Sequence, residues 1–205
     1  MTVFMQRHWF KVLVVVVLIV IGGSLLLQLG GKENLPVIKK AQAFQLTSAD
    51  GQKVALEDDA GKVRLVYFFY GSCPDVCYPT NHILSKVQEE LAKDKIFGTD
   101  VVMYSISFDP YRDTPERLNE YAKSLNADAR GWKFLRGDEK AVFELAKQYG
   151  VGIIKGNDGT FAHNNVATLV DRDGNIRKYF NVAQADVKYQ DIAKSIGQLA
   201  KEPVK

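Results

Sequence analysis

Residues 63–77 read V-R-L-V-Y-F-F-Y-G-S-C-P-D-V-C, and this stretch decides the fold. Val63–Tyr70 is β-branched and aromatic with one charge, which is typical of a central strand buried on both faces. A loop, Gly71–Tyr78, follows, and from Pro79 to about Lys95 the apolar residues recur at helical spacing. A strand that runs through a short loop into a helix predicts an α/β protein. Such proteins usually place their sites at the carboxyl edge of the sheet, where this loop lies.

The rest of the sequence continues this alternation of strands and helices. We expect strands at Asp100–Ser107 and Trp132–Leu135, helices from Thr114, from Asp138 to Gly150 and from Asp186 to about Lys201, and hairpins at 44–56 and 168–180. Thr114-Pro115-Glu116 combines a capping hydroxyl, a first-turn proline and an acidic side chain near the positive end of the helix dipole. We therefore predict a mixed sheet flanked by helices, preceded by an N-terminal β-hairpin.

Composition and charge narrow the class of protein. Apolar residues make up 46% and charged residues 25% of the 205-residue chain, a balance that allows a packed core and excludes a disordered chain. Residues 1–32 hold three of the 27 basic side chains and none of the 24 acidic ones, so residues 33–205 carry 24 of each sign. No basic stripe interleaved with aromatic residues is visible, and we expect no nucleic-acid partner.

The N-terminal segment has the pattern of a membrane anchor. Val12–Leu27 contains no charge, and a helix over Trp9–Leu29 would be roughly 31 Å long, about the thickness of a bilayer core. A cleaved signal peptide is the alternative, but Leu27–Gly31 fits a small-residue cleavage site poorly. Arg7 and Lys11 precede the run, and the positive-inside rule keeps that end in the cytoplasm.

These features predict four parts of the chain. We expect a cytoplasmic N-terminus (1–11), a single-pass anchor in the lipid bilayer of the cell (inner) membrane (12–29), a tether (30–43) and a periplasmic or extracytoplasmic domain (44–205). In that compartment the two cysteines can form a disulfide.

Cys73 and Cys77 are the only cysteines, and both lie between the buried strand and the helix. The positive end of a helix dipole favours the thiolate, the form that attacks disulfides and binds soft metals. A purely structural disulfide would close a very short loop and so stabilise the fold little. Two functions remain open: a redox pair that shuttles between dithiol and disulfide, and part of a copper site.

A copper site of this kind needs a further ligand, and histidine is the natural choice. Structural zinc would usually require four protein ligands, whereas Cu(I) is content with two sulfurs and one imidazole. His163 precedes the strand at Thr168 and can face the same sheet edge as the cysteines, although its spacing leaves open whether it is a ligand. His82 lies inside the predicted helix, and we interpret it as a surface residue; His8 lies on the cytoplasmic side.

Two acidic segments have both a functional and a plain interpretation. Asp75, between the cysteines, either accepts a hydrogen bond beside a bound metal or is a solvated turn residue. Asp109–Pro115 reads as a turn followed by a helix cap.

Several motifs in order resemble the Sco/SenC family. They are C-P-D-V-C from Cys73 to Cys77, S-F-D-P-Y-R-D-T-P-E-R-L from Ser107, W-K-F-L-R-G-D-E from Trp132, and His163 ahead of T-L-V-D-R-D-G-N. The resemblance runs from about Phe44 to Phe180. It implies a thioredoxin-like fold, membrane anchoring, and a copper site formed by Cys73, Cys77 and His163.

The resemblance also implies a function in cytochrome c oxidase assembly. We expect a metallochaperone, rather than an enzyme, that delivers copper to the dicopper site of cytochrome c oxidase subunit II. A periplasmic copper chaperone or a thiol reductant would be a further partner. The alternatives are a thiol–disulfide reductase that keeps the acceptor cysteines reduced, with Cys73 and Cys77 as the catalytic pair, and a copper or redox sensor.

The sequence departs from the family pattern at two places. Tyr78 stands between the second cysteine and Pro79, where many members have proline directly after that cysteine. Ala162 and Asn164 flank His163, where many members have an acid before the histidine and a small hydroxyl after it. The expected ligands are present, but a carboxylate beside the histidine is not.

Overall fold

The computed structural model describes residues 2–30, 33–71, 77–184 and 186–204. It divides into two units, Met1–Asn34 and Leu35–Lys205. The first unit contains helix α1 (Thr2–Gly30). Among the described residues, no helix combines the length and the hydropathy that a membrane span requires. The predicted helix over residues 12–29 is thus present within α1, while its predicted crossing of a membrane is not supported.

The second unit is built on a mixed sheet with the strand order β1-β10-β9-β4-β5-β6-β2-β3. Its strands are β1 (Lys39–Lys40), β2 (Gln45–Ser48), β3 (Lys53–Ala55), β4 (Val63–Phe69), β5 (Val101–Ser107), β6 (Trp132–Arg136), β9 (Val166–Val170) and β10 (Asn175–Asn181). β4, β5 and β6 are parallel neighbours, and the other pairs are antiparallel. A separate two-stranded antiparallel sheet pairs β7 (Ile153–Lys155) with β8 (Phe161–His163).

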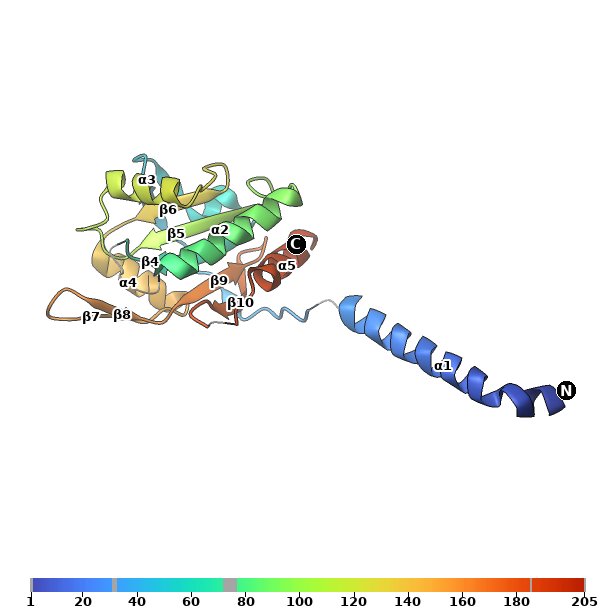
Figure 1. The fold of residues 1–205 in the computed structure, drawn as a ribbon. Coiled ribbons are helices and arrows are strands. Elements are labelled where there is room, and N and C mark those ends of the chain that lie inside the picture. Colours follow the sequence, from blue (N-terminus) through green and yellow to red (C-terminus); the bar gives the residue numbers. More distant parts are fainter. Residues whose placement is uncertain (1, 31–32, 72–76, 185, 205) are drawn as a thin grey trace. The chain divides into compact units, whose positions relative to one another are not determined.

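Helices cover both faces of the sheet, as the thioredoxin-like prediction requires (Figure 1). They are α2 (Cys77–Lys93), α3 (Pro115–Ser124), α4 (Glu139–Gln148) and α5 (Tyr189–Ala200), with a short 3-10 helix η1 (Leu56–Asp59) after β3. Apolar side chains of α2, α3 and α5 share one core cluster, and those of α4 belong to the other.

Strand β4 explains why the sheet has two covered faces. All seven of its residues are buried. Leu65, Tyr67 and Phe69 join the core under α2 and α5, whereas Val66 and Phe68 join the core under α4. Because successive side chains of a strand point to opposite faces, a strand between two helical layers needs apolar residues on both faces, as β4 has from Leu65 to Phe69.

The helix starts follow the capping signals in the sequence. The Thr114 side chain accepts a hydrogen bond from the Arg117 N–H at the start of α3, with Pro115 in the first turn. The Asp138 side chain accepts from the Ala141 N–H at the start of α4. Both predicted hairpins are also confirmed, as β2–β3 and β9–β10.

Two features differ from the sequence-based expectation. The predicted tether over residues 30–43 does not match the structure beyond Asn34, because Leu35 is buried in the core and β1 pairs with β10. The Arg177 guanidinium donates to the Leu35 carbonyl oxygen at 2.6 Å. The second difference is the β7–β8 hairpin, which the sequence did not predict and which ends with His163 as the last residue of β8.

Candidate metal centre

The thiol loop begins where β4 ends and finishes where α2 begins. Tyr70 and Gly71 follow β4, and Cys77 is the first residue of α2, two residues earlier than the predicted start at Pro79. For Cys77 the structure describes the backbone alone. Cys73 and Asp75 lie outside the described residues, so their predicted functions remain predictions.

A buried carboxyl group lies next to the start of this loop. The Gly71 N–H donates to Asp113 Oδ2 at 2.9 Å, and the Ser107 hydroxyl donates to the same oxygen. Asp113 Oδ1 is buried and has no hydrogen-bond partner among the described residues. Burial raises the pKa of Asp113, and these two hydrogen bonds offset only part of that rise. Since a Cβ on Gly71 would come within 2.7 Å of Asp113 Oδ1, only glycine fits here without movement.

His163 lies at the end of β8, opposite Ile153 of β7, and is half-buried. Its ring is 5.1 Å from the ring of Phe108 and 6.1 Å from the ring of Tyr70, both in edge-on geometry. Phe108 follows β5 and Tyr70 follows β4, so aromatic residues at the carboxyl ends of two parallel strands hold the imidazole. The sequence-based expectation that His163 faces this sheet edge is confirmed by these contacts.

The two nitrogens of His163 are in different environments. Nδ1 lies 3.3 Å from the carbonyl oxygen of Asn164, which only accepts hydrogen bonds. In a neutral imidazole this assigns the proton to Nδ1 and leaves the lone pair on Nε2. Nε2 is buried and has no partner in the part of the chain that the structure describes. Burial lowers the pKa of His163, with a smaller opposing effect from Asn164.

Arg112 connects the loop after β5 to the histidine hairpin. Its guanidinium pairs with Asp109 and donates to the Gly159 carbonyl oxygen at 2.8 Å. The guanidinium carbon lies 5.4 Å from the centre of the Phe161 ring and 5.9 Å from that of Tyr70. Asp109–Pro115 is therefore a turn and a helix cap, as predicted, and it also holds the β7–β8 hairpin.

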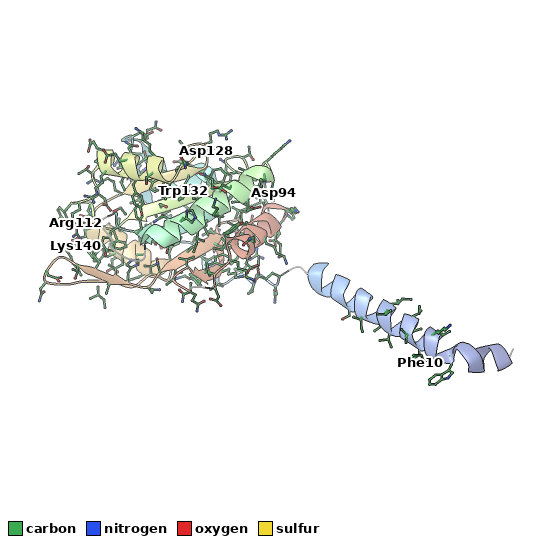
Figure 2. All side chains as sticks on the ribbon, in the orientation of Figure 1. Phe10, Asp94, Arg112, Asp128, Trp132 and Lys140 are labelled. Atoms are coloured by element: carbon green, nitrogen blue, oxygen red, sulfur yellow. The ribbon has the colours of Figure 1, made fainter. Side chains whose placement is uncertain are left out.

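The other histidine candidate lies elsewhere. His82 is exposed on α2, which confirms its interpretation as a surface residue. Figure 2 shows Arg112 at one end of the second unit together with Lys140 of α4, while Asp94, just after α2, lies at the other end. The candidate centre is thus at the end of the domain where β4 and β5 finish.

The described residues supply one donor that suits a copper or zinc ion, the Nε2 of His163. An unprotonated imidazole nitrogen, buried and unbonded, is the donor that copper and zinc bind. Within the described ranges, no group of three or more His, Cys, Asp or Glu side chains is arranged around a metal position. A set of ligands made of His163 and both cysteines extends beyond these ranges.

Sequence reasoning missed Asp113 and Asn165 at this centre. Asp113 contacts Gly71 across 42 positions, and Asn165 contacts Thr80 across 85 positions. No local pattern indicates such pairings. The one available signal was the run of polar residues after β5, which a helix cap also explains.

Comparison with known protein families identifies the family to which this chain belongs. A sequence model of the SCO1/SenC family matches residues 33–200. This match covers most of the chain, and the chain therefore belongs to the SCO1/SenC family, as the motifs predicted.

Individual relatives are similar over most of their length. The chain is 28% identical over 195 residues to the SCO2-like protein RT0576 of Rickettsia typhi, covering 86% of this chain and 92% of that protein. It is 28% identical over 164 residues to the SCO1 protein homolog of Bacillus subtilis, covering 78% and 83%.

Solved structures agree on the fold. A SCO1/SenC family lipoprotein from Bacillus anthracis matches with a TM-score of 0.73 and 27% identity, over 80% of this chain and 96% of that one. BsSco, described with a disulfide switch as a member of the Sco family of cytochrome c oxidase assembly proteins, matches at 0.72 and 25%, over 83% and 99%. Bradyrhizobium japonicum ScoI with copper bound matches at 0.65 and 29%, over 78% and 99%. The thioredoxin-like class of the fold is thereby established.

Proposed function

We propose that this protein is a copper-binding assembly factor that uses Cys73, Cys77 and His163 to carry copper to the dicopper site of cytochrome c oxidase subunit II. The observation that carries the proposal is the state of His163. Its Nε2 is buried without a hydrogen-bond partner among the described residues, and its Nδ1 faces a carbonyl oxygen. A buried polar atom without a partner is costly unless a ligand satisfies it.

The chemistry of the three residues suits copper as cargo. Two thiolates and one imidazole are soft and intermediate ligands that suit Cu(I), and their small number leaves room for ligands of an acceptor. Transfer by ligand exchange needs thiolates of the acceptor to replace those of the donor in turn. The copper-bound structure of the Bradyrhizobium relative, at 29% identity, supports the choice of metal.

An anaerobic copper titration of the full chain in detergent tests this proposal. The wild type is expected to hold one copper per chain, with sulfur-to-copper charge-transfer bands in the Cu(II) form. His163→Ala should weaken binding and change these bands. His82→Ala is the matched control, because His82 is an exposed histidine on α2, and should bind as the wild type does. Copper binding by the wild type that is no tighter than nonspecific binding to surface side chains would refute the proposal.

A thiol–disulfide reductase is the second candidate, favoured by the start of α2 at Cys77 and by the disulfide switch described for BsSco. One thiolate would attack an acceptor disulfide, forming a mixed disulfide and releasing the other acceptor sulfur as a thiolate. The second cysteine would then displace the acceptor's remaining sulfur. Two electrons pass to the acceptor, and the Cys73–Cys77 disulfide is left.

His163 separates the two candidates, because thiol exchange does not require it. Oxidase activity in a strain that carries His163→Ala is expected to be lost if copper delivery is the function. Full oxidase maturation in that strain, together with failure in Cys73→Ser, would favour the reductase.

We further propose that residues 12–29 anchor the protein, with residues 1–11 in the cytoplasm and the second unit in the periplasm. The support is the uncharged run from Val12 and the exposure of its side chains, such as Leu18 at 62% and Ile19 at 66%. Resistance of the membrane-bound protein to carbonate extraction, with protease digestion of the C-terminal domain only from the periplasmic side, is expected. Release by carbonate would contradict the anchor.

A further inference from the structure

The residue two positions after His163 joins three parts of the fold. Asn165 is 5% exposed. The Tyr67 hydroxyl donates to Asn165 Oδ1 at 2.7 Å, and Asn165 Nδ2 donates to Thr80 Oγ1 at 3.0 Å. The backbone carbonyl oxygen of Asn165 accepts from the Val182 N–H at 2.9 Å. Both ends of the amide and the backbone oxygen are therefore used.

The partners of Asn165 lie on the elements that border the thiol loop. Tyr67 is on β4, four residues before Gly71, and Thr80 is in the first turn of α2, three residues after Cys77. Tyr67 and Thr80 are each 1% exposed. Since hydrogen bonds in a dry, low-dielectric interior are strong and costly to leave unmade, this chain of bonds fixes the separation of the elements that it joins.

The amide of Asn165 meets two demands at this position. The Tyr67 hydroxyl needs an acceptor, and the Thr80 hydroxyl, which also donates to the Val182 carbonyl oxygen at 3.4 Å, needs a donor. A leucine offers neither and an aspartate offers no donor. The side chain of Asn165 thus has a defined orientation, and Asn165 follows His163 by two positions in the chain.

We propose that Asn165 is a positioning residue of the candidate metal centre: through Thr80 it holds His163 at a fixed distance from the helix that begins with Cys77. This inference deepens the proposed function and rests on it. A purely structural asparagine would stabilise the fold without affecting the ligand geometry. Substitution of a positioning residue, in contrast, changes copper binding because it displaces His163, and it has no effect on copper binding once His163 is removed.

The variants that separate these cases remove one hydrogen bond at a time. Thr80→Val keeps the shape of the side chain and removes the hydroxyl, Thr80→Ser keeps the hydroxyl, and Asn165→Ala removes the amide. Ser85→Ala is the matched control, because Ser85 is another buried hydroxyl on α2 and donates to the Leu125 carbonyl oxygen at 3.0 Å. Urea unfolding first shows which variants are folded, and Thr80→Val carries the test if Asn165→Ala does not fold.

The measurement is a Cu(I) affinity by competition with a coloured chelator, followed by electron paramagnetic resonance of the Cu(II) form. Thr80→Val and Asn165→Ala are expected to lower the affinity about tenfold or more, the range typical for residues that orient metal ligands, and to change the copper hyperfine splitting. Thr80→Ser and Ser85→Ala should leave both unchanged. In a His163→Ala background, Thr80→Val should cause no further loss of affinity.

The outcomes also distinguish a failure of this inference from a failure of the proposed function. Absence of stoichiometric copper in the wild type would refute the function itself. Copper binding in the wild type with equal affinity and spectrum in Thr80→Val would overturn the positioning role and leave the function standing. An equal loss in Ser85→Ala, or a further loss in the His163→Ala background, would show that the effect is general destabilisation.

Discussion

Two buried aspartates lie near opposite ends of the sheet and differ in how their charge is satisfied. Asp59, 3% exposed, precedes β4, and its carboxylate bonds to Lys62 at 3.0 Å, to Lys133 at 2.7 Å and to the Tyr104 hydroxyl. Asp113, fully buried, follows β5 and leaves one oxygen without a partner among the described residues.

Their pKa shifts have opposite signs for this reason. Burial alone would raise the pKa of Asp59, but hydrogen bonds from Lys133, Tyr104 and Lys62 outweigh it and the net pKa is lowered. Burial raises the pKa of Asp113, and its two hydrogen bonds do not compensate. Asp59, before β4, is thus bonded at both carboxylate oxygens. Asp113 and His163, near the carboxyl ends of β4 and β5, each keep a buried polar atom that has no partner among the described residues, as functional sites often do.

The largest loss of stability is expected for a substitution of Asp59, whose carboxylate has partners at both oxygens. Asp59→Ala removes the shared partner of two lysines and a buried tyrosine hydroxyl, so we expect a loss of about 3 kcal/mol in the free energy of unfolding. Copper affinity should remain that of the wild type, because the cluster lies at the amino end of the sheet. Urea unfolding and chelator competition measure the two quantities. A loss of copper affinity in a fully folded Asp59→Ala protein would contradict the separation of the Asp59 cluster from the candidate metal centre.

The second effect concerns the glycine beside Asp113. Gly71→Ala brings a Cβ within 2.7 Å of a buried carboxylate oxygen, so either the loop or Asp113 must shift. We expect a loss of about 1–3 kcal/mol in unfolding free energy, with weaker copper binding. Gly197→Ala in α5 is the control, since no atom of the described residues lies within 4 Å of its added Cβ, and a helical alanine is favoured. Equal stability of Gly71→Ala and wild type would disprove the close approach.

The third effect depends on pH. The raised pKa of Asp113 means that the native protein binds its proton more tightly than the unfolded chain does. The wild type therefore loses stability as pH rises from 3.8, the ordinary value, through the higher native pKa. Asp113→Asn has no carboxyl group to titrate and lacks this loss. The unfolding free energy of the variant, relative to that of the wild type, should therefore rise across that window and then level off. Urea unfolding at a series of pH values measures it, and an advantage that shrank with rising pH would have the wrong sign.

The smallest effect is the titration of His163. Because burial lowers its pKa, the ring should titrate below 6.5 in the copper-free protein and near 6.5 in the urea-unfolded chain. The native state is then stabilised above 6.5 and loses this contribution as pH falls towards the native pKa. Nuclear magnetic resonance of the ring protons follows the titration, with His163→Ala to assign the signal. A native pKa above 6.5 would show that the imidazole is not desolvated.

The sheet and its helices could be predicted from the sequence because their signals are local. The apolar run of β4 and the caps Thr114 and Asp138 each act within a few residues. β1 could not be predicted, since its two exposed lysines form a strand only through pairing with β10. The β7–β8 hairpin was also missed, because its strands are three residues long and Ile154 is 72% exposed.

Candidate ligands could be proposed from the sequence, but the residues that contact His163 and the thiol loop could not. His163 was identified as a candidate from its place before a strand, and the family motifs then favoured it. Asn165, Asp113 and Arg112 act through contacts with residues far away in the sequence. Such pairings depend on how the chain folds back on itself, and only the structure shows them.

X-ray absorption spectroscopy of the Cu(I)-loaded wild type and of His163→Ala tests the central claim most directly. The account predicts two sulfur ligands and one nitrogen ligand in the wild type, and loss of the nitrogen with both sulfurs kept in the variant. A wild-type spectrum with sulfur ligands alone, or one that His163→Ala leaves unchanged, would contradict it.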